Sequence, residues 1–154
     1  MKFTDSEVYK LHEIVIRLDT VAQRVVLVPI GLTYAEFLVL MAAKEIQRPN
    51  QQEVSKMIGA SKSLVSQRVK ALVGKRLLRQ TVNDSNRREH RLEITRKGSE
   101  VLSAACLALL EAAHEVFVAL GKDRVTLNGL LDRTLECVIQ TETRLMAPRK
   151  NLMS

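Results

Sequence analysis

The chain has 154 residues, enough for a single domain with a sizeable buried core. Its basic excess is concentrated: residues 44–97 hold 14 Lys and Arg against 5 Asp and Glu, a net charge of +9, whereas the rest of the chain carries −2. This favours a polyanionic partner over a merely soluble basic surface. Charged residues near the start argue against a signal peptide, so we expect a cytoplasmic protein with no membrane partner.

The first predicted helix spans residues 5–28. Thr4 and Glu7 have the spacing of a capping box, and Pro29 with Gly31 predicts the end of the helix. Apolar residues recur along it every three or four positions: Val8, Leu11, Val15, Leu18, Ala22 and Val25. A heptad-like stripe of this length needs a partner surface.

Three further helices follow in quick succession. The capping-box pairs Thr33 with Glu36 and Asn50 with Glu53 begin the second and the third, and Ser61 is the predicted N-cap of the fourth. A very short turn separates the third helix from the fourth. Two helices joined in this way indicate a helix-turn-helix.

The fourth helix has an apolar face formed by Val65, Val69 and Leu72. Its other face carries hydroxyl groups, an amide and cations: Ser61, Lys62, Ser63, Ser66, Gln67 and Lys70. A recognition helix in the major groove needs short or flexible donors, since long side chains would hold its backbone away from the bases. We expect base-edge contacts from Ser63, Ser66 and Gln67, and phosphate contacts from Lys62 and Lys70.

Two strands are predicted next, over residues 77–82 and 90–95, with a polar turn between them. Arg87 and Arg88 lie in that turn, where there is no core for them to join. A narrow minor groove attracts arginine, so we expect both to contact DNA; an ordinary solvated turn is the alternative. Helix, helix and basic-tipped hairpin together predict a mainly α-helical, winged helix-turn-helix fold.

Two long helices complete the chain, over residues 96–120 and 123–145. Glu111 and Glu115 interrupt the apolar part of the first, which is therefore predicted to be buried or interfacial and not a membrane span. One face of the second is apolar: Leu127, Leu131, Leu135, Val138 and Leu145. This face, like that of the first helix, needs a partner.

Other classes of function have little support. Cys106 and Cys137 show no CxxC spacing and have apolar neighbours, which predicts reduced thiols in the core. His12, His90 and His114 lack the spacing of a zinc site, so we expect neither a metal nor a cofactor. Without a phosphate-binding glycine loop, a nucleophile elbow or a close carboxylate pair, we expect no enzyme.

This order of parts resembles the MarR family of winged-helix regulators. The resemblance covers about residues 31–98 and is carried by "GLTYAEFLVL", "NQQEVSKMIGASKSLVSQRVKALVGKRLL" and "DSNRREHRLEITRKG". The family's wing has an Asp-x-Arg pattern before Leu-x-hydrophobic-Thr. Arg88 matches its DNA-contacting arginine, whereas Asn86 replaces the acidic residue, for which Asp84 is a candidate substitute.

The resemblance implies a single domain, with residues 31–98 as the DNA-binding lobe and residues 5–28 and 99–146 as the dimerisation lobe. It implies a homodimeric repressor that binds a pseudo-palindromic operator in double-stranded DNA. A small phenolic or carboxylate effector would release the DNA from a pocket between the lobes. The alternative is a winged helix used for protein contact, without a specific DNA site, and it predicts an apolar recognition face.

Two residues on the first helix are candidates for that effector pocket. His12 and Asp19 flank the apolar stripe on the same side. His12 is our candidate ligand-binding residue, because imidazole titrates near neutral pH. The plainer alternative is a hydrogen bond between subunits or contact with water.

Overall fold

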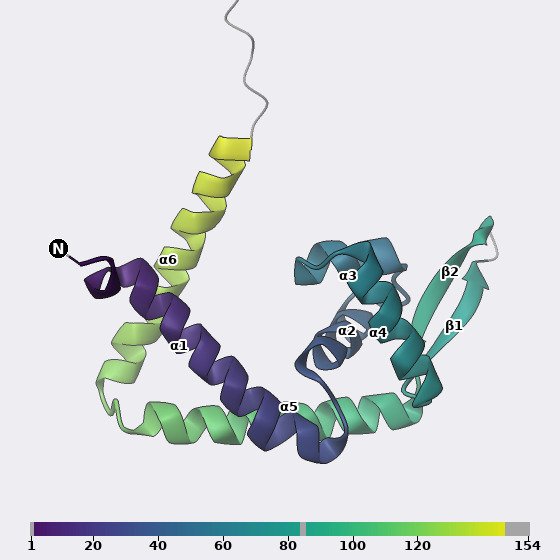
Figure 1. Ribbon diagram of the computed structural model, residues 1–154, viewed down its shortest axis with the longest axis horizontal. Helices are drawn as coiled ribbons and strands as arrows, with labels where there is room; N and C mark the ends of the chain where they lie inside the picture. The colour runs from purple at the N-terminus through teal and green to yellow at the C-terminus, as the bar shows by residue number, and fades with distance from the viewer. Residues whose placement is uncertain (1, 84–85, 147–154) are drawn as a thin grey trace, which may run out of the picture. The chain divides into compact units, whose positions relative to one another are not determined.

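The computed structural model describes residues 2–83 and 86–146, with the side chains of all of these except residues 83 and 86–89. The described chain is mostly helical, with a two-stranded sheet (Figure 1). Its elements in chain order are η1 (Phe3–Asp5), α1 (Glu7–Val21), η2 (Ala22–Leu27), η3 (Val28–Ile30), α2 (Tyr34–Glu45), α3 (Gln51–Ile58), α4 (Lys62–Gly74), β1 (Leu78–Asn83), β2 (Asn86–Ile94), α5 (Arg96–Val118) and α6 (Asp123–Met146). The chain divides into two compact units, Met1–Ala113 and His114–Ser154.

The N-terminal helix begins later than the sequence pattern suggested. Residues Phe3–Asp5 form a short 3-10 turn, and α1 is capped by Ser6, whose Oγ accepts the Tyr9 N–H at 3.3 Å. The predicted capping box of Thr4 and Glu7 is therefore wrong. Thr4 lies inside the 3-10 turn, so its hydroxyl group is not at the helix start.

The chain stays helical through the predicted end of this first helix, although its hydrogen bonding changes along its length. After α1 the chain continues through the π-helical turn η2 and the 3-10 turn η3. Gly31 then ends it in the left-handed region at φ 75°, which a glycine adopts without strain. The Leu32 N–H donates to the Leu27 carbonyl at 3.0 Å, which closes the end of the helix. We call residues 7–31 the N-terminal rod.

Helices α2, α3 and α4 begin where the sequence predicts. Both capping boxes form: Thr33 with Glu36, and Asn50 with Glu53. Ser61 caps α4 by accepting the Leu64 N–H at 3.2 Å. Together with the hairpin and the first turns of α5, the three helices enclose one core: Leu32, Phe37, Val39, Leu40, Ala42, Ala43, Val54, Val65, Val69, Leu72, Leu77, Leu78, Leu92, Leu102 and Ala105, joined by Val26 and Leu27 of η2. We call this region the winged-helix lobe.

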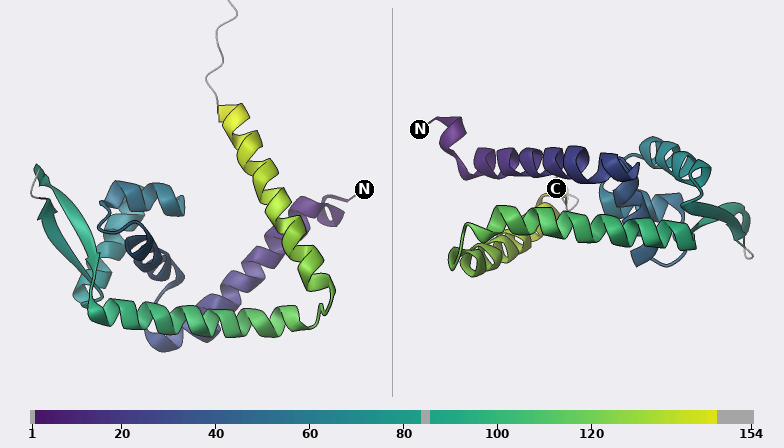
Figure 2. Two further views of the ribbon diagram at one scale, coloured as in Figure 1. Left: turned by 180° about the vertical axis from the view of Figure 1, so that it is seen from behind. Right: turned by 90° about the horizontal axis from the view of Figure 1, so that it is seen from below.

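Strands β1 and β2 form an antiparallel hairpin that projects from the helices of this lobe (Figures 1 and 2). Pairing runs from Leu78 opposite Ile94 to a bulge after Val82. Because β2 already begins at residue 86, Arg87 and Arg88 lie in a strand, and their predicted place in the turn is wrong. Ladder hydrogen bonds join main-chain groups whatever the side chains are, so charged residues can extend an exposed hairpin.

The start of α5 closely approaches the segment that joins α4 to β1. Gly98 is buried, and a Cβ atom built on it would lie 2.0 Å from the Leu77 carbonyl oxygen. Beside it, Thr95 Oγ1 accepts the Gly98 N–H at 2.9 Å and donates to the Arg76 carbonyl at 2.8 Å. Only glycine fits at this position without moving one of the two backbones.

The second compact unit buries little of its apolar surface by itself. Helix α6 has no buried residue among those that the structure describes, and Leu135 and Val138 on its apolar face are 60% and 56% exposed. Cys137 lies on this helix and is exposed, so its predicted place in the core is wrong. The reason is that this face of α6 has no partner among the described residues of its unit. Cys106, on α5, packs against the core of the lobe.

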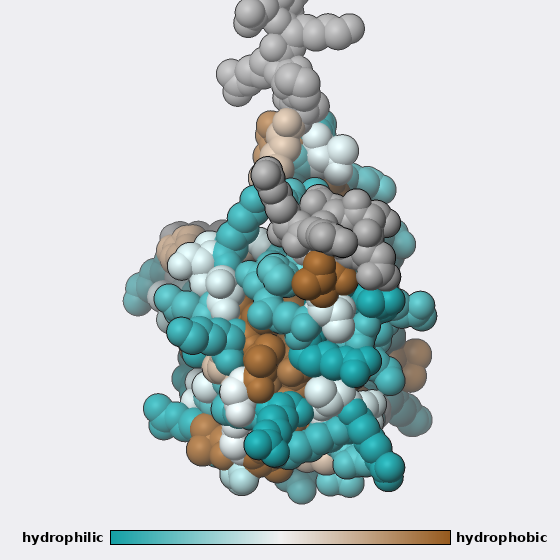
Figure 3. Space-filling view, turned by 90° about the vertical axis from the view of Figure 1, so that its right-hand side faces the viewer, coloured by the Kyte–Doolittle hydropathy of each residue, from teal (hydrophilic) through white to brown (hydrophobic). Residues whose placement is uncertain are grey.

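Helix α5 meets the length and composition criteria for a membrane span, with 11% of its most apolar window buried. Its first turns nevertheless belong to the lobe, because Leu102 and Ala105 are core residues. On the side where the hairpin lies, the molecular surface is mostly hydrophilic with small apolar islands (Figure 3).

Candidate nucleic-acid interface

Helix α4 separates its polar side chains from its apolar ones as the sequence predicts. Val65, Val69 and Leu72 are buried against the core. All six candidate DNA-binding residues of this region are exposed: Ser61, Lys62, Ser63, Ser66, Gln67 and Lys70. One helix thus presents hydroxyl groups, an amide and two ammonium groups to solvent on a rigid support.

Two residues at the start of α4 already have partners. The Ser61 oxygen accepts the N–H of Leu64, so it acts as a helix cap, and its hydroxyl hydrogen can still be donated. The Lys62 ammonium donates to Gln52 Oε1 of α3 at 3.4 Å. Since that acceptor is neutral, the charge of Lys62 stays uncompensated.

A pocket of about 250 Å³ opens beside α4. Its lining combines residues of α3, α4 and β1: Gln51, Ser66, Val69, Lys70, Val73 and Gln80. Ser66 and Lys70 lie one helical turn apart, so a hydroxyl and an ammonium flank the same space. Sequence reasoning missed Gln51 and Gln80, because their nearness to α4 depends on tertiary packing.

Three arginines of residues 44–97 form ion pairs with carboxylates of the same segment. Arg48 and Arg79 share the carboxylate of Glu93, at 2.7 and 2.5 Å. Arg91 pairs with Glu53 at 3.0 Å. Glu53 and Glu93 are already subtracted in the net charge of +9, so these pairs show which arginines are engaged and leave the net excess unchanged.

The two lysines of the polar face of α4 remain available. Within the described part of the chain, neither Lys62 nor Lys70 has a carboxylate within 4.0 Å. The exposed face of α4 therefore keeps its positive charge.

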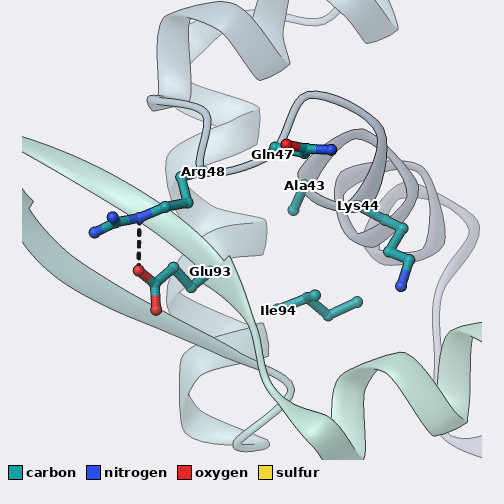
Figure 4. Close-up of a pocket in the computed structure, with 6 residues that line it drawn as sticks. All are labelled: Ala43, Lys44, Gln47, Arg48, Glu93 and Ile94. Atoms are coloured by element: carbon teal, nitrogen blue, oxygen red, sulfur yellow. Dashed lines mark ion pairs between the residues drawn. The ribbon is translucent and has the colours of Figure 1, made fainter.

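A larger pocket, of about 370 Å³, lies where the end of α2 faces β2, and is lined by Ala43, Lys44, Gln47, Arg48, Glu93 and Ile94 (Figure 4). Arg48 points to Glu93 and is paired with it, whereas Lys44 extends on the far side.

Arg68 is a further candidate that the sequence reasoning missed. It lies on α4 at the edge of the buried face and is half-buried. Its Nε is buried and has no hydrogen-bond partner, a property that it shares only with Thr81 Oγ1 among the described side chains. Buried donors are nearly always satisfied, so this guanidinium has an unused donor beside the recognition face.

The remaining predicted residues lie elsewhere. Arg87 and Arg88 are in β2, but their side chains, and the predicted support from Asn86 or Asp84, lie outside the described residues. His12 is exposed on α1. Among the described residues, no group of three His, Cys, Asp or Glu side chains is placed to hold a metal ion.

Asp19 interacts with Tyr34 at the start of α2. Burial raises the pKa of Tyr34, and the charge of the Asp19 carboxylate, which also accepts a hydrogen bond from Tyr34, raises that pKa further. The Tyr34 N–H donates to Gln23 Oε1 of η2 at 2.6 Å. The N-terminal rod is therefore tied to the beginning of α2 at two points.

Comparison with known proteins identifies a family match and several solved structures with a similar fold. Residues 30–89 match the MarR family, and no curated protein sequence matches the chain. CouR, a transcriptional repressor solved with a 23-mer DNA duplex, is 27% identical with a TM-score of 0.75, over 88% of this chain and 94% of that chain. CouR from Rhodococcus jostii RHA1, solved with p-coumaroyl-CoA bound, is 24% identical to this chain with a TM-score of 0.74. The match covers 90% of this chain and 94% of that chain.

A third similar structure concerns the regulation of DNA binding of Bordetella bronchiseptica BpsR by 6-hydroxynicotinic acid. It is 18% identical with a TM-score of 0.75, over 88% of this chain and 96% of that chain. The fold, the helix-turn-helix with its hairpin and the sequence match over residues 30–89 agree. Residues 30–89 therefore match the MarR family, and the chain has the winged-helix fold of these solved transcriptional regulators.

Proposed function

We propose that this protein is a transcriptional regulator that binds a specific sequence in double-stranded DNA. The observation that carries the proposal is the exposed polar face of α4, opposite a fully buried apolar face. Short hydroxyl groups allow the helix to lie deep in a major groove, and lysines supply attraction to phosphates.

The contacts on α4 divide between bases and phosphates. Ser63 and Gln67 are exposed away from the pocket and suit base edges, where an amide can bind an adenine with two hydrogen bonds. Ser66 and Lys70 flank the pocket of about 250 Å³ and suit a backbone phosphate, with Gln51 and Gln80 as further donors. Ser66 is thus better placed for a phosphate than for the base edge expected from sequence.

The proposed active form is a homodimer. Both α1 and α6 expose apolar residues along their length, including Val8 at 68%. Residues 5–28 and 99–146 would form the dimerisation lobe, and residues 31–98 the DNA-binding lobe. A two-fold dimer places its recognition helices in half-sites about one helical turn of DNA apart, so the operator is a pseudo-palindrome.

Repression with release by a small molecule is the regulatory mode that we favour. CouR was solved with p-coumaroyl-CoA, and BpsR is regulated by 6-hydroxynicotinic acid, an aromatic carboxylic acid. A phenolic or carboxylate effector fits this chemistry, with His12 as a candidate contact. Such a ligand would act by shifting the population toward a conformation that no longer fits the grooves. The proposal places the protein in the cytoplasm, without catalytic activity.

The alternative, a protein-interaction module without a DNA site, needs an apolar patch on the recognition face. The described side chains of that face are instead polar, from Ser61 to Lys70. Selection of duplexes from a random-sequence library distinguishes the two. An enriched inverted repeat supports the regulator, whereas weak binding to every duplex with a steep salt dependence contradicts sequence specificity.

Matched variants test the division of labour on the selected duplex. Lys70→Met should weaken binding to all sequences and reduce the slope of log K against log salt by about 1, because one phosphate contact is lost. Gln67→Ala should relax preference at one base pair and leave the slope unchanged. Lys122→Met, at an exposed lysine after α5, is the control for loss of one charge. Equal effects of the two test variants on random DNA would contradict the assignment.

A further inference from the structure

Lys75 lies at the C-terminal end of the recognition helix and joins it to the N-terminal rod. It is the C-cap residue of α4, and its ammonium group donates to the Gly31 carbonyl at 2.8 Å. The same group donates to both carboxylate oxygens of Glu36, at 2.8 and 2.9 Å. An ammonium has three N–H donors, and these acceptors lie 39 and 44 residues away along the chain.

Glu36, the ion-pair partner of Lys75, is buried, so water cannot replace the ammonium group as its partner. Glu36 is 2% exposed, and its carboxylate also accepts the Thr33 N–H at 2.8 Å in the capping box of α2. If α4 moved away from the rod, a buried carboxylate would lose its cation, which is far more costly than separating a surface ion pair. The contact therefore holds the end of α4 at a fixed place against Gly31 and α2.

The helix that follows the wing is attached at the same place. Thr95 Oγ1 donates to the Arg76 carbonyl at 2.8 Å, and the Lys97 ammonium donates to the Lys75 carbonyl at 3.4 Å. The rod and α5 are the elements that lead to the two parts of the proposed dimerisation lobe. Both are thus hydrogen-bonded to the last turn of α4 or to the residues just after it.

We propose that Lys75 is a positioning residue, which fixes the direction of α4 relative to the N-terminal rod and so determines the half-site spacing that the protein accepts. The inference rests on the proposed function, since it assumes a dimer that reads two half-sites. Lys75 contacts no base in this account and acts through the orientation of α4. Sequence specificity within a half-site is then independent of it, whereas spacing preference is not.

The experiment uses the full chain and duplexes that carry the selected half-sites at the selected spacing, or with one base pair added or removed. The wild-type protein should prefer the selected spacing. Lys75→Met should lose at least about fivefold of that preference, the lower end of typical coupling between sites. Lys75→Arg, which keeps a cation with several donors, should restore it. Lys122→Met is the control for charge, and circular dichroism gives the folded fraction of each variant.

Each outcome separates this inference from the proposed function. If Lys75→Met weakens binding at every spacing by the same factor, the lysine only stabilises the fold and the inference is overturned, while the proposed function stands. If the wild-type protein selects no sequence at all, the proposed function fails and the inference fails with it. Should Lys75→Met not fold, Lys75→Gln, which keeps a donor without the charge, gives the same comparison.

Discussion

The winged-helix lobe and helix α6 differ in how far their apolar side chains are buried. In the lobe, Val65, Val69 and Leu72 of α4 are almost completely buried. On α6, Leu135 and Val138 have the same helical spacing and remain more than half exposed. The lobe completes its core from its own residues, whereas the apolar face of α6 stays exposed among the residues that the structure describes. This difference indicates that the lobe is a self-sufficient fold and that α6 requires a second surface.

The largest effect is expected from a substitution that disrupts the proposed dimer interface on α6. Leu135→Glu would place a charge in the proposed dimer interface, where an unpaired carboxylate is costly to bury. We expect a monomer by light scattering and loss of binding to the selected duplex. Gln140→Glu adds the same charge on the opposite side of α6 and should leave the dimer intact. A dimeric Leu135→Glu protein would show that this face is not the interface.

The next effect concerns the lobe alone. Gly98→Ala puts a Cβ atom 2.0 Å from the Leu77 carbonyl oxygen, so one backbone must shift. We expect the free energy of unfolding to fall by about 1–3 kcal/mol, the usual cost of overpacking. Gly74→Ala has no atom within 4 Å of its new Cβ and should gain about 0.5–1 kcal/mol in a helix. Urea unfolding measures both, and equal effects would contradict the close approach.

Acid should lower the folding stability of the winged-helix lobe, because Glu36 becomes protonated. Burial alone would raise the pKa of Glu36, but hydrogen bonds from Lys75 and the Thr33 N–H outweigh it and hold that pKa below 4.5. A lowered pKa contributes stability that is complete above about 4.5, the value for the unfolded chain, and is lost as the pH falls through the lower folded value.

The variant Glu36→Gln isolates this contribution. It should be less stable than the wild-type protein at pH 7, and the difference in unfolding free energy should shrink toward pH 3. A difference that is constant over this range of pH would show that the carboxylate charge does not matter.

The smallest effect is a gain in stability at the end of α4. Arg76 adopts φ 60°, a left-handed conformation that is unfavourable for a residue with a Cβ. Arg76→Gly should therefore raise the free energy of unfolding by up to about 1 kcal/mol. Gly59→Ala, at φ 63° after α3, is the reverse change and should lower it by a similar amount. Thermal unfolding of both variants checks the pair.

Local features of the fold could be predicted from the sequence because they depend on neighbouring residues. The capping boxes at Thr33 and Asn50 join side chains to backbone groups three residues away, and both form. The buried face of α4 follows from helical period. The start of β2 and the ion pair between Glu36 and Lys75 depend instead on register and on packing between distant segments, which no local pattern specifies.

The candidate site could likewise be predicted from the sequence only where it depends on the period of one helix. The exposed polar face of α4 was expected in full, from Ser61 to Lys70. Gln80 joins the pocket from β1, and Arg68 keeps an unused donor, and neither fact could be seen before the elements were packed. The exposure of Cys137 was missed because an apolar sequence context does not say whether its partner lies in the same chain.

The mass of the complex on the selected duplex tests the central claim most directly. Two chains of 17.3 kDa should bind one duplex that carries two half-sites, and the same two chains should stay together without DNA. One chain per duplex, with undiminished affinity when one half-site is scrambled, would contradict a dimer that reads two half-sites with its two α4 helices.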